Sequence, residues 1–99
     1  MRGGRPQTPT LLPGIDLEKE TVIYGVVSSD DAPVPGAYVR LLDVMGDFVG
    51  SVVTSATGDF RFFAAPGTWT LSVQHRLGDA TRDVRAFTAG LFAVSVTLQ

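Results

Sequence analysis

The sequence has no cysteine, one histidine and one lysine among its 99 residues. Without cysteine, the chain has no disulfide framework, no thiolate nucleophile and no cysteine-based zinc site. The one histidine, His75, has no second imidazole with which to share a metal ion, and no serine-centred motif of a catalytic triad accompanies it. We therefore expect no metal, no cofactor and no catalytic residue.

Clustered positive charge is also absent. The formal net charge is −2, Lys19 is the only lysine, and the arginines are dispersed along the chain. Because binding to phosphates needs clustered Lys and Arg, this pattern argues against a nucleic-acid binder. No run approaches the roughly 18 apolar residues of a membrane-spanning helix, and residues 1–14 lack the apolar centre of a signal peptide. We expect a cytoplasmic protein that does not bind the membrane.

Proline is concentrated at the amino terminus. Three of the six prolines lie in residues 1–14, where the apolar residues follow no regular period. This composition is typical of a flexible or extended segment. We interpret residues 1–15 as a flexible arm and residues 16–99 as one β-sandwich domain, since a chain of this length rarely forms two cores.

From Thr21 onward, apolar side chains recur at every second position, which is the period of a half-buried β-strand. Turn residues separate the apolar runs at intervals of about 8–12 residues, and no segment shows the 3.6-residue period of a helix. The predicted strands cover residues 21–27, 37–43, 48–54, 59–64, 68–76, 81–87 and 91–98. We predict an all-β fold, a seven-stranded antiparallel β-sandwich.

Several motifs follow one another in a recognisable order. They read GVVS at 25–28, VPGAYVRL at 34–41, TSATGDFRF at 54–62 and PGTWTLSV at 66–73. Together they resemble the carboxypeptidase-regulatory-like domains, which form a prealbumin-like (transthyretin-like) Greek-key sandwich. Gly36 and Gly58 fall at turns of that pattern that need a positive φ, and Trp69 replaces its common tyrosine.

A narrower resemblance is carried by DLEKETVI at 16–23 and ATGDFRFFAAPG at 56–67. These runs are similar to DUF1416, an actinobacterial family of unknown function whose members look like stand-alone copies of this domain. The members are often encoded beside thiosulfate sulfurtransferases, so the resemblance implies a link to sulfur metabolism. Some members carry a cysteine after the initiator methionine, where this chain has Arg2.

The residues that could take part in catalysis or metal binding lack the partners that such sites need. We interpret His75, at the end of a predicted strand, as a surface residue. Hydroxyisourate hydrolases resemble this fold, but they use several histidines and a characteristic carboxy-terminal tetrapeptide that this chain lacks. Asp30 and Asp31 are adjacent, yet two prolines follow where a calcium loop would place oxygen ligands. We therefore predict that the protein is not an enzyme.

An apolar row on the first strand is the most distinctive surface feature of the sequence. The alternation places Val22, Tyr24 and Val26 on the outward face, and Tyr38 and Leu42 extend the row if the first two long strands are neighbours. We predict a protein interface at these five residues. Two other interpretations stay open: the row is simply exposed, or the amino-terminal segment covers it. The apolar residues of that segment are Leu11, Leu12, Ile15 and Leu17.

The sequence thus favours a non-enzymatic protein-interaction or scaffold module that binds a protein partner or forms a homodimer. The family resemblance makes a thiosulfate sulfurtransferase the first partner to test. A small-ligand or carbohydrate-binding sandwich is the alternative, and it needs an exposed aromatic such as Trp69. A cryptic hydrolase that depends on His75 is the third interpretation.

Overall fold

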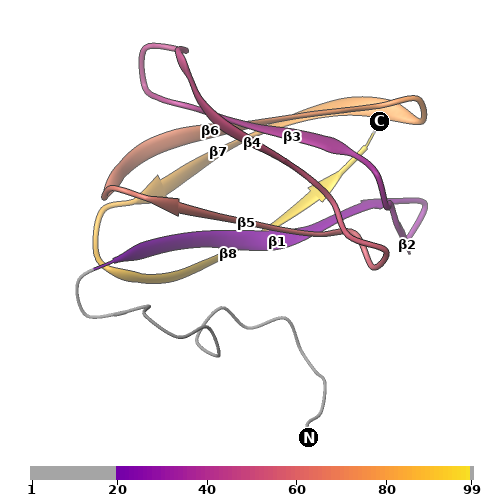
Figure 1. Ribbon diagram of the computed structural model, residues 1–99, viewed down its shortest axis with the longest axis horizontal. Helices are drawn as coiled ribbons and strands as arrows, with labels where there is room; N and C mark the ends of the chain where they lie inside the picture. The colour runs from indigo at the N-terminus through magenta and orange to yellow at the C-terminus, as the bar shows by residue number, and fades with distance from the viewer. Residues whose placement is uncertain (1–19, 99) are drawn as a thin grey trace, which may run out of the picture.

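The alternating pattern folds into two β-sheets that pack face to face, as seen in the computed structural model, which describes residues 20–98 (Figure 1). The described residues contain eight strands and no helix. The strands are β1 (Thr21–Ser29), β2 (Ala32–Pro33), β3 (Tyr38–Leu42), β4 (Phe48–Val53), β5 (Asp59–Ala64), β6 (Gly67–His75), β7 (Gly78–Ala86) and β8 (Gly90–Thr97). The predicted sandwich is therefore confirmed in outline.

Each sheet has four strands, and they come from separate parts of the sequence. Sheet A has β1 at its centre, between β5 and β8, and the short β2 pairs with the end of β1. Sheet B has the order β4-β3-β6-β7 and is antiparallel throughout. The layer that contains β3, β4, β6 and β7 lies above the layer of β1, β5 and β8 in Figure 1.

One strand pair corrects the prediction of a wholly antiparallel sandwich. Strands β1 and β8 run parallel, with Thr21 opposite Gly90 and Ser28 opposite Thr97. The prediction excluded parallel neighbours because the chain has no crossover helix. Here the chain between β1 and β8 contains strands β2 to β7, which belong to both sheets. The chain returns to the start of β8 through these strands, so no helix is needed.

The eighth strand, β2, was not predicted, because its residues lie in a stretch rich in turn residues. Asp30 and Asp31 both adopt a positive φ, of 51° and 66°, and link β1 to β2. A two-residue connection with both residues left-handed is the turn whose twist matches paired antiparallel strands. Ser28 and Ser29 therefore pair with Pro33 and Ala32. The seven predicted strands are all present, and β2 adds a short extension to sheet A.

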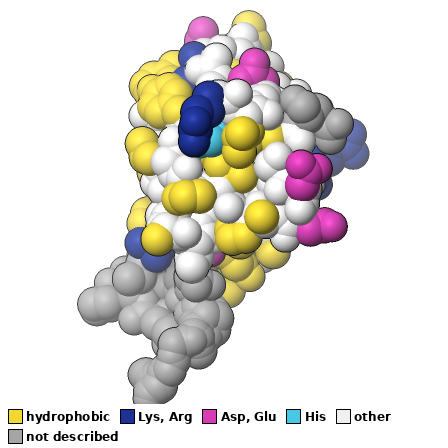
Figure 2. All heavy atoms as spheres, turned by 90° about the vertical axis from the view of Figure 1, so that its right-hand side faces the viewer, with side chains coloured by type: hydrophobic (Ala, Val, Ile, Leu, Met, Phe, Trp, Pro, Cys, Tyr) yellow, Lys and Arg dark blue, Asp and Glu magenta, His cyan; other side chains and the backbone are white. Residues whose placement is uncertain are grey.

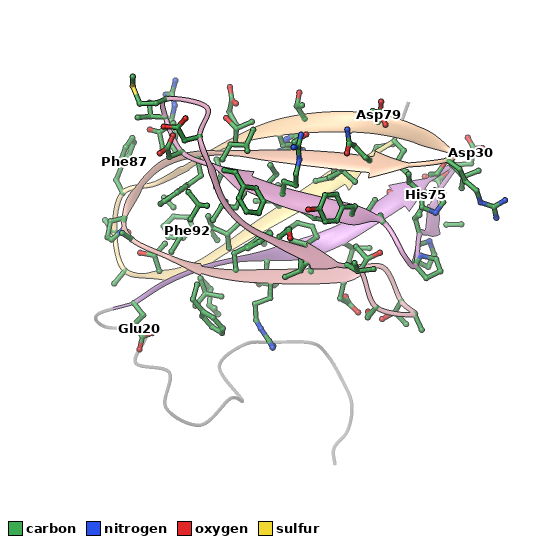
Figure 3. All side chains as sticks on the ribbon, turned by 45° about the horizontal axis from the view of Figure 1, so that its top comes forward. Glu20, Asp30, His75, Asp79, Phe87 and Phe92 are labelled. Carbon is green, nitrogen blue, oxygen red and sulfur yellow. The ribbon has the colours of Figure 1, made fainter. Side chains whose placement is uncertain are left out.

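The core lies between the sheets and is formed by the inward side chains of each strand. It is almost wholly aliphatic at its centre, with Phe60 and Phe62 contributed by β5. Phe92 of β8 packs against it and points between the layers in Figure 3. The fully buried aliphatic residues of the cluster include Ile23, Val27, Val39, Leu71, Val73 and Val96. These are the positions that the two-residue alternation marks as inward.

Two glycines are required by close approaches of the backbone. A Cβ at Gly25, in the centre of β1, would lie 1.6 Å from the carbonyl oxygen of Val94, so no side chain fits beside β8. Gly58 has φ 77°, and a Cβ there would lie 2.7 Å from the carbonyl oxygen of Val27. The positive φ predicted for Gly36 and Gly58 is confirmed, at 73° and 77°.

The buried side chain of Thr54 fixes the loop that leads into β3. Its hydroxyl donates a hydrogen bond to the carbonyl of Val34 at 2.7 Å and accepts one from the backbone N–H of Ala37 at 2.8 Å. The N–H of Thr54 donates to the carbonyl of Ala37 at 2.9 Å. One side chain thus satisfies two buried backbone groups and sets where β3 begins.

The predicted arm, residues 1–15, lies outside the described residues, as do residues 16–19 and Gln99. Within residues 20–98 there is no helix long and apolar enough to cross a membrane.

Candidate interaction surface

The hairpin of β3 and β4 carries the largest group of exposed apolar side chains. Ten large hydrophobic residues are exposed in the described part of the chain, and six of them lie on this hairpin between Tyr38 and Val53. Tyr38 of β3 pairs with Val53 of β4, and Leu42 pairs with Phe48. Side chains of directly paired residues share one face of a sheet. These four residues therefore lie on the outer face of sheet B.

A bulge places Phe48 on that face. Leu41 is opposite Gly50, but the next residue, Leu42, is opposite Phe48, so Val49 is the extra residue on β4. A bulge adds one residue to one strand and changes which side chains share a face. As a result, Phe48 lies beside Leu42 and is 57% exposed.

The loop between the strands extends the surface beyond the sheet. The carboxylate of Asp43 accepts hydrogen bonds from the N–H groups of Met45 and Asp47, both at 2.9 Å. The N–H of Gly46 donates to the carbonyl of Asp43 at 2.9 Å. These bonds hold a turn whose tip presents Val44 and Met45, which are 75% and 80% exposed. We define the hairpin face as Tyr38, Leu42, Val44, Met45, Phe48 and Val53.

A guanidinium lies in the middle of the hairpin face. Arg40 pairs with Ser51 on one side and with Ser72 on the other, between Tyr38 and Leu42 along β3. Its Nη2 lies 3.5 Å from the hydroxyl of Ser72, while its Nε is buried without a hydrogen-bond partner among the described residues. Aromatic residues and arginine are the types most often found at the energetic centre of protein interfaces.

The structure separates the two halves of the interface predicted from sequence. Strand β1 belongs to sheet A and β3 to sheet B, so Tyr38 and Leu42 do not extend the row of Val22, Tyr24 and Val26. The extension depended on the first two long strands being neighbours, but the loop before β3 carries the chain from one sheet to the other. The two groups of residues lie on opposite outer faces of the sandwich.

The outer face of sheet A is less exposed than the sequence indicated. Val22 is completely buried, Tyr24 is half-buried, and Val26 is 37% exposed. Strand β1 lies at the centre of its sheet, with β5 and β8 on either side. Phe63, paired with Val22, is half exposed, and the guanidinium of Arg61 lies 5.6 Å from the centre of its ring.

Sequence reasoning missed the exposed residues of β4 and its loop. The predicted strand over residues 48–54 includes Phe48 and Val53, and apolar residues in a strand are normally assigned to a core. A signal was present: a turn of the sequence V-M-G-D places two large apolar residues in a position that strands cannot bury.

A hollow at one end of the sandwich contains His75. It has a volume of about 180 Å³ and lies between the β1–β2 turn and the β6–β7 turn, lined by Ser29, Pro33, Pro35, His75 and Arg76 among others. Figure 2 looks onto this end, where the imidazole lies beside a basic side chain, and Figure 3 shows His75 and Asp30 at the same end.

The contacts of His75 are those of a turn residue. Its Nδ1 accepts a hydrogen bond from the N–H of Leu77 at 3.1 Å, which uses one ring nitrogen to hold the β6–β7 turn. No group of three or more His, Cys, Asp or Glu residues in the described part of the chain could hold a metal ion. The hollow therefore offers one imidazole and one guanidinium without a second acid or base.

Trp69 does not form an exposed platform. Its side chain is half-buried and packs against the core, and its indole N–H donates to the carbonyl of Ala65 at 2.9 Å. The carbohydrate-binding alternative needs an exposed aromatic platform, and Trp69 does not provide one.

Sequence comparison places the chain among proteins without an assigned activity. The DUF1416 family, described as a protein of unknown function, matches residues 3–98. Uncharacterized protein Rv0814c of Mycobacterium tuberculosis is 50% identical over 99 residues, which make up 99% of each chain. An uncharacterized protein of Mycolicibacterium smegmatis is 54% identical over 84 residues, which make up 84% of this chain and 93% of that protein.

Structural comparison identifies the same kind of sandwich in an enzyme. The dioxygenase domain of a dioxygenase and carbohydrate-binding protein fusion from Streptomyces sp. SirexAA-E superposes with a TM-score of 0.63, over 82% of this chain and 80% of that domain. The sequences are 14% identical. At this identity the likeness shows the fold alone.

Proposed function

This chain belongs to the DUF1416 family of unknown function, and we propose that it acts as a non-enzymatic protein-interaction module of the cytoplasm through the hairpin face. The observation that carries the proposal is the concentration of exposed apolar side chains on one hairpin. Six of the ten exposed large hydrophobic residues described lie there. Clusters of this kind on a monomer mark sites of protein association.

The shape of the hairpin face favours binding of a protein over binding of a small molecule. The outer surface of a sheet is broad and open, whereas small ligands are usually held in concave pockets. Tyr38 and Phe48 provide aromatic groups, and Arg40 between them offers charge-assisted hydrogen bonds. A partner with a carboxylate flanked by apolar side chains would satisfy both features.

The loop tip adds apolar area at little entropic cost. Because the Asp43 carboxylate already holds the turn with two hydrogen bonds, binding does not have to order the backbone around Val44 and Met45. Preorganised contact residues lose less conformational freedom on association than mobile ones do. Met45 is also suited to irregular surfaces, since its side chain is unbranched and polarizable.

A thiosulfate sulfurtransferase is the partner to test first. This choice rests on the resemblance to a family whose members are often encoded beside such enzymes. The module would then act by binding, and the reaction would belong to the enzyme. Within residues 20–98 no acid lines the hollow beside His75, and this supports the division of roles.

The experiment compares two matched tyrosine variants in a pull-down with purified sulfurtransferase. We expect Tyr38→Asp to lower recovery of the enzyme at least about tenfold, since a charge replaces an exposed aromatic of the hairpin face. Tyr24→Asp introduces the same change on the outer face of sheet A and should leave recovery unchanged. Circular dichroism of both variants checks that each is folded.

The opposite ranking would overturn the proposal. Loss of binding with Tyr24→Asp and normal binding with Tyr38→Asp would assign the interaction to sheet A. No binding of the wild-type chain would remove the sulfurtransferase as the partner, and equal binding by all three chains would remove the hairpin face as the site.

A further inference from the structure

Each sheet of the sandwich has two edge strands, and they differ in how they are protected. The edges of sheet A are β5 and β8, and those of sheet B are β4 and β7. An edge strand presents unpaired N–H and C=O groups that can pair with another strand, and most proteins block this with charges, prolines or a covering group.

Three of the four edges carry such protection. Strand β7 contains four charged residues, Asp79, Arg82, Asp83 and Arg85, and β5 contains Asp59 and Arg61. Strand β8 has no charge of its own, but the guanidinium of Arg82 donates a hydrogen bond to the carbonyl of Ser95. This bond occupies an acceptor on the free side of β8.

Strand β4 is the exception. Its sequence, FVGSVV, contains no charged residue and no proline. The bulge at Val49 lies at its start, so residues 50–53 form a regular edge. Ser51 and Val53 are both exposed. Among the described residues, β3 is the only strand that pairs with β4.

The free backbone groups of β4 can be identified from the hydrogen bonds to β3. The N–H of Thr54 donates to the carbonyl of Ala37, so it points toward β3. Backbone groups of successive residues in a strand point to opposite sides. The N–H and C=O groups of Val53 and Ser51 therefore point away from β3, toward the open side.

From these features we propose that β4 pairs antiparallel with β4 of a second copy, forming a two-fold dimer with one continuous sheet. A two-fold axis beside Val52 sets Ser51 of each copy opposite Val53 of the other, and each such pair exchanges two backbone hydrogen bonds. The regular part of the edge, residues 50–53, carries no charge in either copy. No like charges meet, which makes the edge complementary to itself.

The second copy fits this edge better than an unrelated strand does. An uncharged strand does not repel any partner by its charge. Pairing with a second copy has a further effect, because it brings the exposed Val53 and Phe48 of both copies to one extended outer face. Pairing of backbones alone buries little area, and a stable dimer needs roughly 1,200 Å² or more in total. The exposed Val53 and Phe48 lie beside the edge and can add apolar contacts to the area that the backbones bury.

The test measures solution mass by light scattering over a range of protein concentrations. We expect the wild-type mass to rise from that of one chain to that of two as concentration increases. Ser51→Pro removes the outward N–H without removing a bond to β3, and proline is tolerated on an edge with its N side free. Because two donors are lost per dimer, we expect the dissociation constant to rise about tenfold to a hundredfold.

Ser51→Ala is the matched control, because it removes the hydroxyl and keeps the N–H. It should dimerise like the wild type. A wild-type mass of one chain at every concentration would overturn the proposal, and so would a dimer that Ser51→Pro leaves unchanged. This inference does not depend on the proposed function, because Ser51→Pro leaves Tyr38 and Arg40 in place for the sulfurtransferase pull-down.

Hydrogen exchange of the unmodified chain gives a reading that needs no variant. The amides of Ser51 and Val53 should exchange slowly at high concentration and quickly at low concentration. Equal exchange rates at both concentrations would contradict pairing through β4, even if the mass showed a dimer.

Discussion

Leu42 lies opposite Phe48 across the β3–β4 hairpin, although the pair beside it sets Leu41 opposite Gly50. The extra residue, Val49, shifts the register by one position. Without this shift Leu42 would face Val49, and Phe48 would not stand beside it on the outer face of sheet B. One bulge therefore determines the composition of the hairpin face.

The ordered conformation of the loop that carries Val44 and Met45 should depend on the carboxylate of Asp43. Replacing Asp43 with Ala removes the acceptor for the N–H groups of Met45 and Asp47. We expect the loop amides to exchange about tenfold faster with solvent, because two hydrogen bonds that hold the turn are lost. Asp43→Asn keeps an acceptor oxygen and should stay close to the wild type. Equal exchange rates in the two variants would show that the backbone alone holds the turn.

The free energy of unfolding should depend more on the hydroxyl of Thr54 than on the volume of its side chain. Thr54→Val keeps the volume but leaves the carbonyl of Val34 and the N–H of Ala37 without their partner. Each buried group left unpaired costs about 1–3 kcal/mol of unfolding free energy. Thr54→Ser keeps the hydroxyl and should lose only about 0.8 kcal/mol for one methyl group. Urea unfolding of both variants measures the difference, and a smaller loss for valine than for serine would contradict this account.

The two strand glycines should respond differently to alanine. A Cβ at Gly25 would overlap the carbonyl oxygen of Val94, so we expect Gly25→Ala to lower the free energy of unfolding by about 3 kcal/mol or more. Gly50 has open space at the same position, and Gly50→Ala should change stability by no more than about 1 kcal/mol. Chemical unfolding checks both. Similar stabilities would mean that β1 and β8 move apart at low cost.

Arg82 should protect the protein against aggregation through β8. Arg82→Ala frees the carbonyl of Ser95 on an edge strand without charge, so we expect faster aggregation on heating. Arg85→Ala removes the same charge from the same strand and serves as the control. Light scattering during a temperature ramp compares the two chains. If both variants aggregate at the same rate, net charge is the cause and the contact with Ser95 is not.

The sequence predicted the strands well because burial of one face leaves a two-residue period. The pattern of Trp69, Leu71 and Val73, for example, can arise only if one side of a strand meets a core. The pairing of strands was harder to predict. Neither the parallel contact of β1 with β8 nor the placement of β1 and β3 in different sheets leaves a local pattern, because both depend on how distant segments meet.

The exposed residues of the hairpin face were predicted in part, because alternation reveals only the side of a strand to which a residue points. Tyr38 and Leu42 were placed outward correctly, since alternation alone determines their side of β3. Phe48 was missed because its exposure depends on the bulge, and a bulge shifts the register without changing the composition of a strand. Val22 points to the side expected for it, but its complete burial could not be read from the alternation.

The most direct test of the hairpin face as a protein-binding site is a hydrogen-exchange footprint of the chain with purified thiosulfate sulfurtransferase. At a chain concentration low enough to keep β4 unpaired, our account predicts slower exchange for the amides of the 43–47 loop and of β4 when the enzyme is present, and unchanged exchange in β1 and β5. Protection confined to β1 and β5, or no protection anywhere at saturating enzyme, would contradict it.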